Sequence, residues 1–262
     1  RQAEANTRMF RADLASGYYA EIRASDPIEL ADVASEYTAA NETITKLLSV
    51  EDTSITWLHT SVSLCDRVAN LAQQKVKGFG GDTAAWRQRA AGRTRRMLEL
   101  DPDNQLYVVL HAFTMSVLDL EPSAENLTAR REALGHARRA LDGGEATSER
   151  LSIYSGNAHR LIRMLNRMDR SKDAFALAQA CLAYLLGREP ATGADQRFAE
   201  TSYAVISAVA QNAERDAAFL QQLRTFRARL AQARQRQGAA DYLSGYIENM
   251  DAIIDRFAGE GK

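Results

Sequence analysis

The sequence contains only two cysteines, Cys65 and Cys181, among 262 residues. A disulfide scaffold or a zinc site needs more cysteines at shorter spacing, so we expect two buried thiols. No apolar run comes close to the roughly 20 residues that a transmembrane helix requires, and we expect no membrane segment within this region. There is no signal-peptide pattern, and the chain begins with Arg1 rather than Met. We therefore expect a cytoplasmic piece of a longer protein, whose upstream part stays open.

Proline and glycine are also scarce, with 4 and 15 residues respectively. Alanine, leucine, arginine, glutamine and glutamate are abundant, and these residues lose little rotamer freedom in a helix. Apolar residues recur at steps of three and four in the stretches 151–168, 219–233 and 243–257, which is the spacing of one helix face. The sequence therefore predicts an all-α fold of about eleven helices, joined by short loops that make neighbouring helices antiparallel.

The breaks between the helical stretches recur along the chain. In the stretch LELDPDN, residues 98–104, one helical pattern stops at Asp101-Pro102 and another starts; further breaks lie at Gly144, Pro190 and Gly238. The interval of about 45 residues holds two helices, which is typical of stacked helix pairs that bury one continuous core. Pro102 is expected at the first position of the following helix, where its missing N–H is no loss. The spacing favours an α-solenoid over an irregular helical globule.

The second helices of these pairs carry small and bulky residues at fixed spacing before a proline. The best match is Ala178, Leu182, Leu185 and Pro190; Ala90, Thr94, Met97 and Pro102 match more loosely, and Ala133, Ala137 and Ala140 continue the small residues between them. This pattern resembles the second helix of a tetratricopeptide (TPR) repeat over roughly residues 56–238. The resemblance implies a right-handed α-solenoid of antiparallel helix hairpins that acts as a protein-binding scaffold, often joined to a sensor or effector domain in bacteria.

The resemblance is incomplete. The period near 45 residues differs from the 34 residues of a TPR repeat, and the first helices lack the Trp…Leu-Gly…Tyr signature, so HEAT-like or other helical repeats stay open. The expected organisation has an N-terminal helical pair in residues 1–55, helix-hairpin repeats in 56–238, and a capping helix with a tail in 239–262. The apolar stripe of that last helix is expected to pack on the helix of residues 212–237, because a terminal repeat must cover its open flank.

No group of residues indicates catalysis, a metal or a cofactor. The four histidines, at positions 59, 111, 136 and 159, are dispersed and lack the spacing of helical metal sites. The glycine-rich stretch KGFGGD, residues 77–82, is not followed by Gly-Lys-Ser/Thr, and no predicted strand precedes it. It is therefore more typical of an interhelical turn than of a phosphate-binding loop. We expect this region to be non-catalytic, and a catalytic domain upstream of residue 1 stays open.

The charges are distributed unevenly. Residues 1–52 carry a net charge of −5 and residues 241–262 carry −3, whereas residues 53–240 carry +7, mostly as arginine. Arginine forks on helix surfaces suit the carboxylates of an acidic peptide or the phosphates of nucleic acid. The bland interpretation, which the pattern favours, is a plain solvated helix face in which arginine replaces lysine. The pI near 6.5 and the acidic ends disfavour nucleic acid, so a protein or peptide partner, an acidic one in particular, is the preferred class.

The inner face of a TPR-like array is lined by the first helix of each pair. Polar and aromatic residues on those helices are the candidate partner-binding residues: Asn70, Gln74, Tyr107, His111, Asn157, Arg160, Arg163 and Tyr203. For the two tyrosines, ordinary helix packing is the alternative. The sequence thus predicts a non-catalytic interaction or regulatory module of a larger bacterial protein. A nucleic-acid-binding helical repeat and a purely structural oligomerisation domain are the alternatives, and the oligomeric state stays open.

Overall fold

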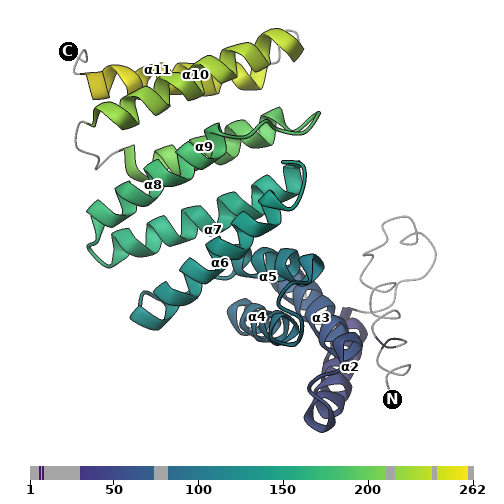
Figure 1. The fold of residues 1–262 in the computed structure, drawn as a ribbon. Helices are drawn as coiled ribbons and strands as arrows, with labels where there is room; N and C mark the ends of the chain where they lie inside the picture. The colour runs from purple at the N-terminus through teal and green to yellow at the C-terminus, as the bar shows by residue number, and fades with distance from the viewer. Residues whose placement is uncertain are drawn as a thin grey trace. The chain divides into compact units, whose positions relative to one another are not determined.

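The structure, a computed structural model, describes residues 30–73, 82–210, 216–237 and 241–258, together with Asn6 and Arg8. Within these ranges it contains ten helices and no strand (Figure 1). The all-α prediction is confirmed. The first half of the N-terminal pair, and Gln74, lie outside the described residues. The helices are α2 (Leu30–Val50), α3 (Ile55–Gln73), α4 (Thr83–Leu100), α5 (Gln105–Val117), α6 (Ala124–Asp142), α7 (Ser148–Arg167), α8 (Ser171–Leu186), α9 (Asp195–Ala210), α10 (Ala217–Gln237) and α11 (Asp241–Ala258).

The chain forms two compact units, residues 1–118 and 119–262, which are described here separately. This division falls inside the region 56–238 that the sequence analysis assigns to repeats. In the first unit α3 contacts both α2 and α4, and α4 contacts α5. The shared core includes side chains from three of these helices: Ile44, Leu48, Leu58, Val62 and Met97. A second cluster holds α2 on α3 and is flanked by Trp86 of α4.

The break at LELDPDN separates α4 from α5. The N–H of Asp101 donates to the carbonyl of Met97 at 3.1 Å and so ends α4. The side chain of Asn104 accepts from the N–H of Leu106 at 3.1 Å and caps the start of α5. The prediction that Pro102 is the first residue of the next helix is wrong. Asn104 is the N-cap of α5, and Pro102 lies in the turn between α4 and α5.

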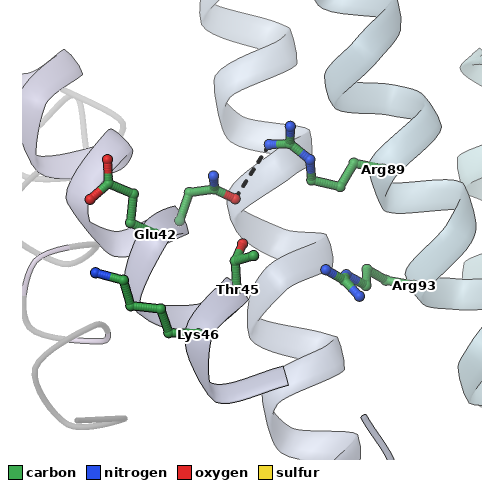
Figure 2. Close-up of a pocket in the computed structure, with 6 residues that line it drawn as sticks. Glu42, Thr45, Lys46, Arg89 and Arg93 are labelled. Carbon is green, nitrogen blue, oxygen red and sulfur yellow. Dashed lines mark hydrogen bonds between the residues drawn. The ribbon is translucent and has the colours of Figure 1, made fainter. Parts of the chain in front are cut away.

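A groove lies between α2 and α4 in the first unit (Figure 2). Arg89 of α4 donates across it to the side-chain oxygen of Asn41 on α2, with the two atoms 3.4 Å apart. Arg87, two residues earlier in α4, donates to the carbonyl of Val117 at the end of α5, with the two atoms 3.1 Å apart. These arginines bridge helices that a purely apolar core would leave unlinked at the surface.

In the second unit, helices contact both their immediate and their next-nearest neighbours in the chain. α7 contacts α6, α8 and α9; α8 contacts α9 and α10; and α11 contacts α9 and α10. The break at 142–148 falls between α6 and α7 as the sequence predicts, and the side chain of Thr147 caps α7 by accepting from the N–H of Arg150. Backbones of successive pairs also meet directly, since the N–H of Ala191 donates to the carbonyl of Ala146 at 3.1 Å.

Tyr184 of α8 links its helix to α6. Its hydroxyl donates to a carboxylate oxygen of Asp142 at 2.8 Å, and the guanidinium groups of Arg138 and Arg188 lie 4.4 Å and 4.5 Å from the centre of its ring. Arg188 also pairs with Asp142. One step further along the chain, Arg229 of α10 donates to the carbonyl of Arg188 at 2.7 Å. Several arginines therefore join one helix pair to the next, which is a role beyond a solvated face.

Helix α11 packs against α10, as the sequence predicts, and also against α9. The ring centres of Phe257 and Phe219 of α10 are 5.5 Å apart, and Tyr246 lies edge-on to Tyr203 of α9 with centres 5.3 Å apart. Met250, in the middle of α11, is fully buried. In the described parts of the chain, no helix is long and apolar enough to cross a membrane.

The packing of α11 generates a stability prediction. We expect Met250→Ala to lower the free energy of unfolding by about 2–5 kcal/mol, because it removes a fully buried side chain and leaves a cavity. The matched control is Asn249→Ala at the exposed neighbouring position, which we expect to change stability by less than about 0.5 kcal/mol. Urea unfolding followed by circular dichroism measures both. Equal stability of the two variants would show that α11 does not contribute to the core.

Candidate functional site

The candidate site is built on helix α7. Its apolar stripe, residues 151–165 at steps of three and four, is buried as predicted. Because one face of the helix is buried, the arginines on the remaining turns lie toward the surface: Arg163 and Arg167 are exposed and Arg160 is half-buried. Arg167 lies in the last turn, where the helix dipole favours a cation. We call Arg160, Arg163 and Arg167, together with Arg130 of α6, the arginine face.

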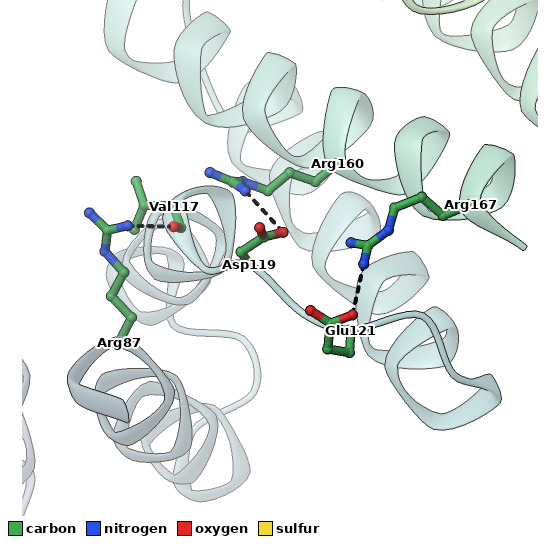
Figure 3. A network of polar contacts seen from close by, with 6 residues as sticks. All are labelled: Arg87, Val117, Asp119, Glu121, Arg160 and Arg167. Carbon is green, nitrogen blue, oxygen red and sulfur yellow. Dashed lines mark hydrogen bonds and ion pairs between the residues drawn. The ribbon is translucent and has the colours of Figure 1, made fainter. Parts of the chain in front are cut away.

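An acidic stretch of the chain lies on this face. Residues 119–121, which we call the acidic segment, precede α6 and carry two carboxylates separated by Leu120. Asp119 is paired with Arg160, with the oxygen and nitrogen 3.6 Å apart, and Glu121 is paired with Arg167 at 2.7 Å (Figure 3). Leu120 and Met164 line the small cavity enclosed between these pairs. The acidic segment therefore places an acidic, an apolar and an acidic side chain in sequence along α7.

Arg130 lies beneath the surface formed by Arg160, Arg163 and Arg167. It is only 1% exposed, although it is an arginine on a helix whose other buried residues are mainly alanine and leucine. Burial lowers the pKa of the Arg130 guanidinium to about 10; the charge of Arg160 adds to this effect and that of Asp119 opposes it. Arg130 therefore remains cationic at neutral pH. Four cations share this region with the two carboxylates of the acidic segment, so the region keeps a positive excess.

His159 responds to that excess. Its pKa is lowered chiefly by burial, and further by the positive charges of Arg163 and Arg160. Arg163 itself has no carboxylate partner among the described residues. Within the described residues, the arginine face thus contains one exposed guanidinium without an ion pair, Arg163. Arg160 and Arg167 pair with Asp119 and Glu121, whose side chains are 75% and 86% exposed.

The other predicted residues of the second unit have different surroundings. Asn157 is fully buried, and its side-chain amide donates to the carbonyl of Ile153 at 2.9 Å. Tyr203 is half-buried and packs edge-on against Tyr246, which is the packing alternative that the sequence analysis left open for it. Of the predicted residues, only Arg160 and Arg163 are therefore brought together at the surface of this unit.

Of the predicted residues that the structure describes, three belong to the first unit. Asn70 is exposed on α3; burial raises the pKa of nearby Asp66, and Arg87, Arg67 and a hydrogen bond from Asn70 oppose that rise. Tyr107 packs at the side of the core cluster that contains Met97. His111 is 7% exposed, and its Nδ1 lies 2.8 Å from the hydroxyl of Thr94. Burial leaves His111 little surface for a partner to contact, whereas Tyr107 is only partly buried.

Neither Arg130 nor the acidic segment is among the residues predicted from the sequence. A signal for Arg130 is present, because residues 130, 133, 137 and 140 follow one another at steps of three, four and three, so Arg130 lies on the same helix face as the buried alanines. The acidic segment has no comparable signal. Its carboxylates meet α7 only because the chain turns back on itself, which places residues 46 positions apart, Glu121 and Arg167, side by side.

Within the described ranges, no group of three or more His, Cys, Asp or Glu side chains could hold a metal ion. Comparison with models of protein families, with curated proteins and with solved structures finds no match to this chain. The arginine face is therefore interpreted from its own geometry and charge.

The electrostatics of α7 can be tested through His159. We expect Arg163→Gln to raise the pKa of His159 toward its ordinary value, because one of the two nearby positive charges is removed. In the unaltered chain the lowered pKa means that the unfolded state takes up this proton first. The stabilising contribution of neutral His159 is therefore complete above its unfolded pKa and declines as pH falls below it.

Nuclear magnetic resonance titration of the His159 ring protons measures this pKa. Arg131→Gln, which removes an exposed arginine of α6, is the matched control and should leave the titration unchanged. An unchanged pKa in Arg163→Gln would mean that burial alone accounts for the shift.

Proposed function

We propose that this chain is a non-catalytic protein-interaction module whose arginine face binds an acidic segment of a partner protein. The observation that carries the proposal is the acidic segment itself, which sits on α7 and pairs with Arg160 and Arg167. This contact within the chain shows that the arginine face can pair with carboxylates on an extended segment. Arg163 has no carboxylate partner among the described residues. A longer acidic ligand would therefore form an additional ion pair with it.

The proposal includes a TPR-like architecture for the helix pairs, arranged as a right-handed solenoid. It is supported by the interval of about 45 residues between breaks and by the contacts of α7 with α9, α8 with α10 and α9 with α11. In such an array the same elements of successive pairs stack on one another. The further inference that the module regulates a larger cytoplasmic protein of bacterial origin rests on the TPR resemblance.

The spacing of the charges indicates which ligands fit. Arg160 and Arg167 are seven residues apart, which corresponds to about 10 Å along a helix. Carboxylates two residues apart on an extended chain are separated by about 7 Å, and the long arginine side chains span the difference. A partner segment with alternating acidic and apolar residues in an extended conformation therefore matches the arginine face, with its apolar side chain taking the place of Leu120 beside Met164.

The acidic segment is a weak internal competitor. Its carboxylates are mostly exposed, and exposed ion pairs contribute about 0–1 kcal/mol each. A partner with more than two acidic residues can displace it, since it also pairs with Arg163 and retains the pairs with Arg160 and Arg167. The chain therefore binds acidic segments in proportion to their number of suitably spaced carboxylates.

A labelled synthetic peptide with the repeated sequence Asp-Leu-Glu tests the proposal by fluorescence anisotropy. Arg160→Glu combined with Arg163→Glu should abolish binding with an almost unchanged melting temperature, because two attractive charges become repulsive at exposed or half-buried positions. Asp119→Asn combined with Glu121→Gln should bind the peptide several-fold more tightly, since the internal competitor is removed. The His159 pKa should rise when the peptide binds, as an anion offsets the charges of Arg160 and Arg163.

The control for charge reversal is Arg131→Glu combined with Arg234→Glu, two exposed arginines outside the arginine face. If peptide affinity falls as much in this control as in the double variant of Arg160 and Arg163, the loss reflects net charge alone. That result would contradict a specific site. Duplex DNA that binds more tightly than the peptide, with a steep dependence on salt, would assign the surface to nucleic acid instead. If the mass in solution depends on Arg160 and Arg163, the surface joins copies of the chain and the proposal is wrong.

A further inference from the structure

The groove between α2 and α4 in the first unit is a second concave surface with an excess of positive charge. It has a volume of about 300 Å³ and is lined by Asn41, Glu42, Thr45, Lys46, Arg89 and Arg93. Three cations face one carboxylate in this set, which gives the lining a net charge of +2. Within the part of the chain that the structure describes, no carboxylate forms an ion pair with Lys46, Arg89 or Arg93.

Two arginines of α4 point into this groove from one side. Figure 2 shows Arg89 and Arg93 extending toward α2, where Thr45 faces them, while the Glu42 and Lys46 side chains point away from the two arginines. The side-chain oxygen of Asn41 accepts from Arg89 in the same groove. Arg89 and Arg93 are four residues apart, so they occupy neighbouring turns of one helix face. Two guanidinium groups, an amide and a hydroxyl therefore surround a shared space.

Arg89 is held in place before any ligand arrives. Its guanidinium lies 4.6 Å from the ring centre of Trp86 and donates to Asn41 at 3.4 Å. Trp86 in turn packs against the buried cluster that contains Tyr37 and Leu64. The stacked ring limits the conformations of an otherwise exposed side chain, which reduces the entropy that binding would cost.

Arg93 is less exposed and has an unsatisfied donor. Its Nε is buried and has no hydrogen-bond partner in the described structure. The charges of Arg89 and Arg93 also extend inward to Cys65, where burial raises the thiol pKa to about 11 and both arginines oppose that rise. A guanidinium with an unsatisfied donor, beside a second guanidinium in a positively charged groove, is an arrangement that an oxyanion can satisfy.

We propose that this groove binds a phosphate monoester group. A dianion balances the net charge of +2, whereas a single carboxylate leaves one charge uncompensated. Several oxygens on one phosphorus can accept from both guanidinium groups and from the Thr45 hydroxyl together. The site is independent of the arginine face, which lies in the other unit.

Isothermal titration calorimetry on the full chain tests the site with two probes, glycerol phosphate and a short peptide that contains phosphoserine. We expect saturable binding of at least one probe, and at least tenfold weaker binding in Arg93→Gln, since a charge-assisted hydrogen bond to the phosphate is lost. Arg89→Gln, at an exposed position, should weaken binding by a similar factor and covers the case in which Arg93→Gln disturbs folding. Arg131→Gln is the matched control and should bind like the unaltered chain.

The two probes distinguish the source of the phosphate. Tighter binding of the phosphoserine peptide assigns the groove to a modified protein, and tighter binding of glycerol phosphate assigns it to a small metabolite. The proposal is overturned if neither probe binds, if the same peptide with glutamate in place of phosphoserine binds equally well, or if Arg89→Gln and Arg131→Gln have equal effects. Because the arginine face is intact in all these variants, failure here leaves the function proposed for α7 unaffected.

Discussion

Every helix described here is amphipathic and must cover its apolar side with a neighbour, and this requirement organises the molecule. Helix α7 meets it most fully, because its stripe packs against α6, α8 and α9. The remaining side of α7 faces water, so its residues are expected to be polar or charged. Arginine suits that position: its aliphatic stem covers apolar surface and its guanidinium stays hydrated or finds a carboxylate. The arginine face follows from the way in which α7 is buried.

The arginines of this chain perform several separable tasks. Arg138, Arg188 and Arg229 join successive helix pairs through Tyr184, Asp142 and backbone carbonyls. Arg160 and Arg167 form ion pairs with the Asp119 and Glu121 side chains, and Arg163 forms none within the described part of the chain. Composition alone shows an abundance of arginine and cannot separate these tasks, because each depends on what another helix places opposite the guanidinium group.

The sequence predicted what depends on local periodicity. The steps of three and four in residues 151–165 and 243–257 identify α7 and α11 and their buried faces, and the glycine-rich break at 142–148 identifies the loop between α6 and α7. It failed where two local signals compete: at LELDPDN the Asn104 side chain sets the start of α5, although Pro102 is also a good first residue. It did not predict the pairing of Glu121 with Arg167: an antiparallel hairpin of α6 and α7 brings these residues, 46 positions apart, to the same end, but the sequence pattern does not show which side chains meet there.

The place of the arginine face along α7 also affects how it attracts ligands at a distance. Arg163 and Arg167 lie in the last two turns of the helix, where the aligned peptide dipoles amount to roughly half a negative charge. That partial charge lies close to the guanidinium groups and partly offsets their positive potential. The whole chain has a net charge of only −1, so there is little long-range steering. A ligand should therefore diffuse to the arginine face with little electrostatic attraction at long range. Ligands are then distinguished at close contact, where the guanidinium groups fit one arrangement of acceptor oxygens better than another.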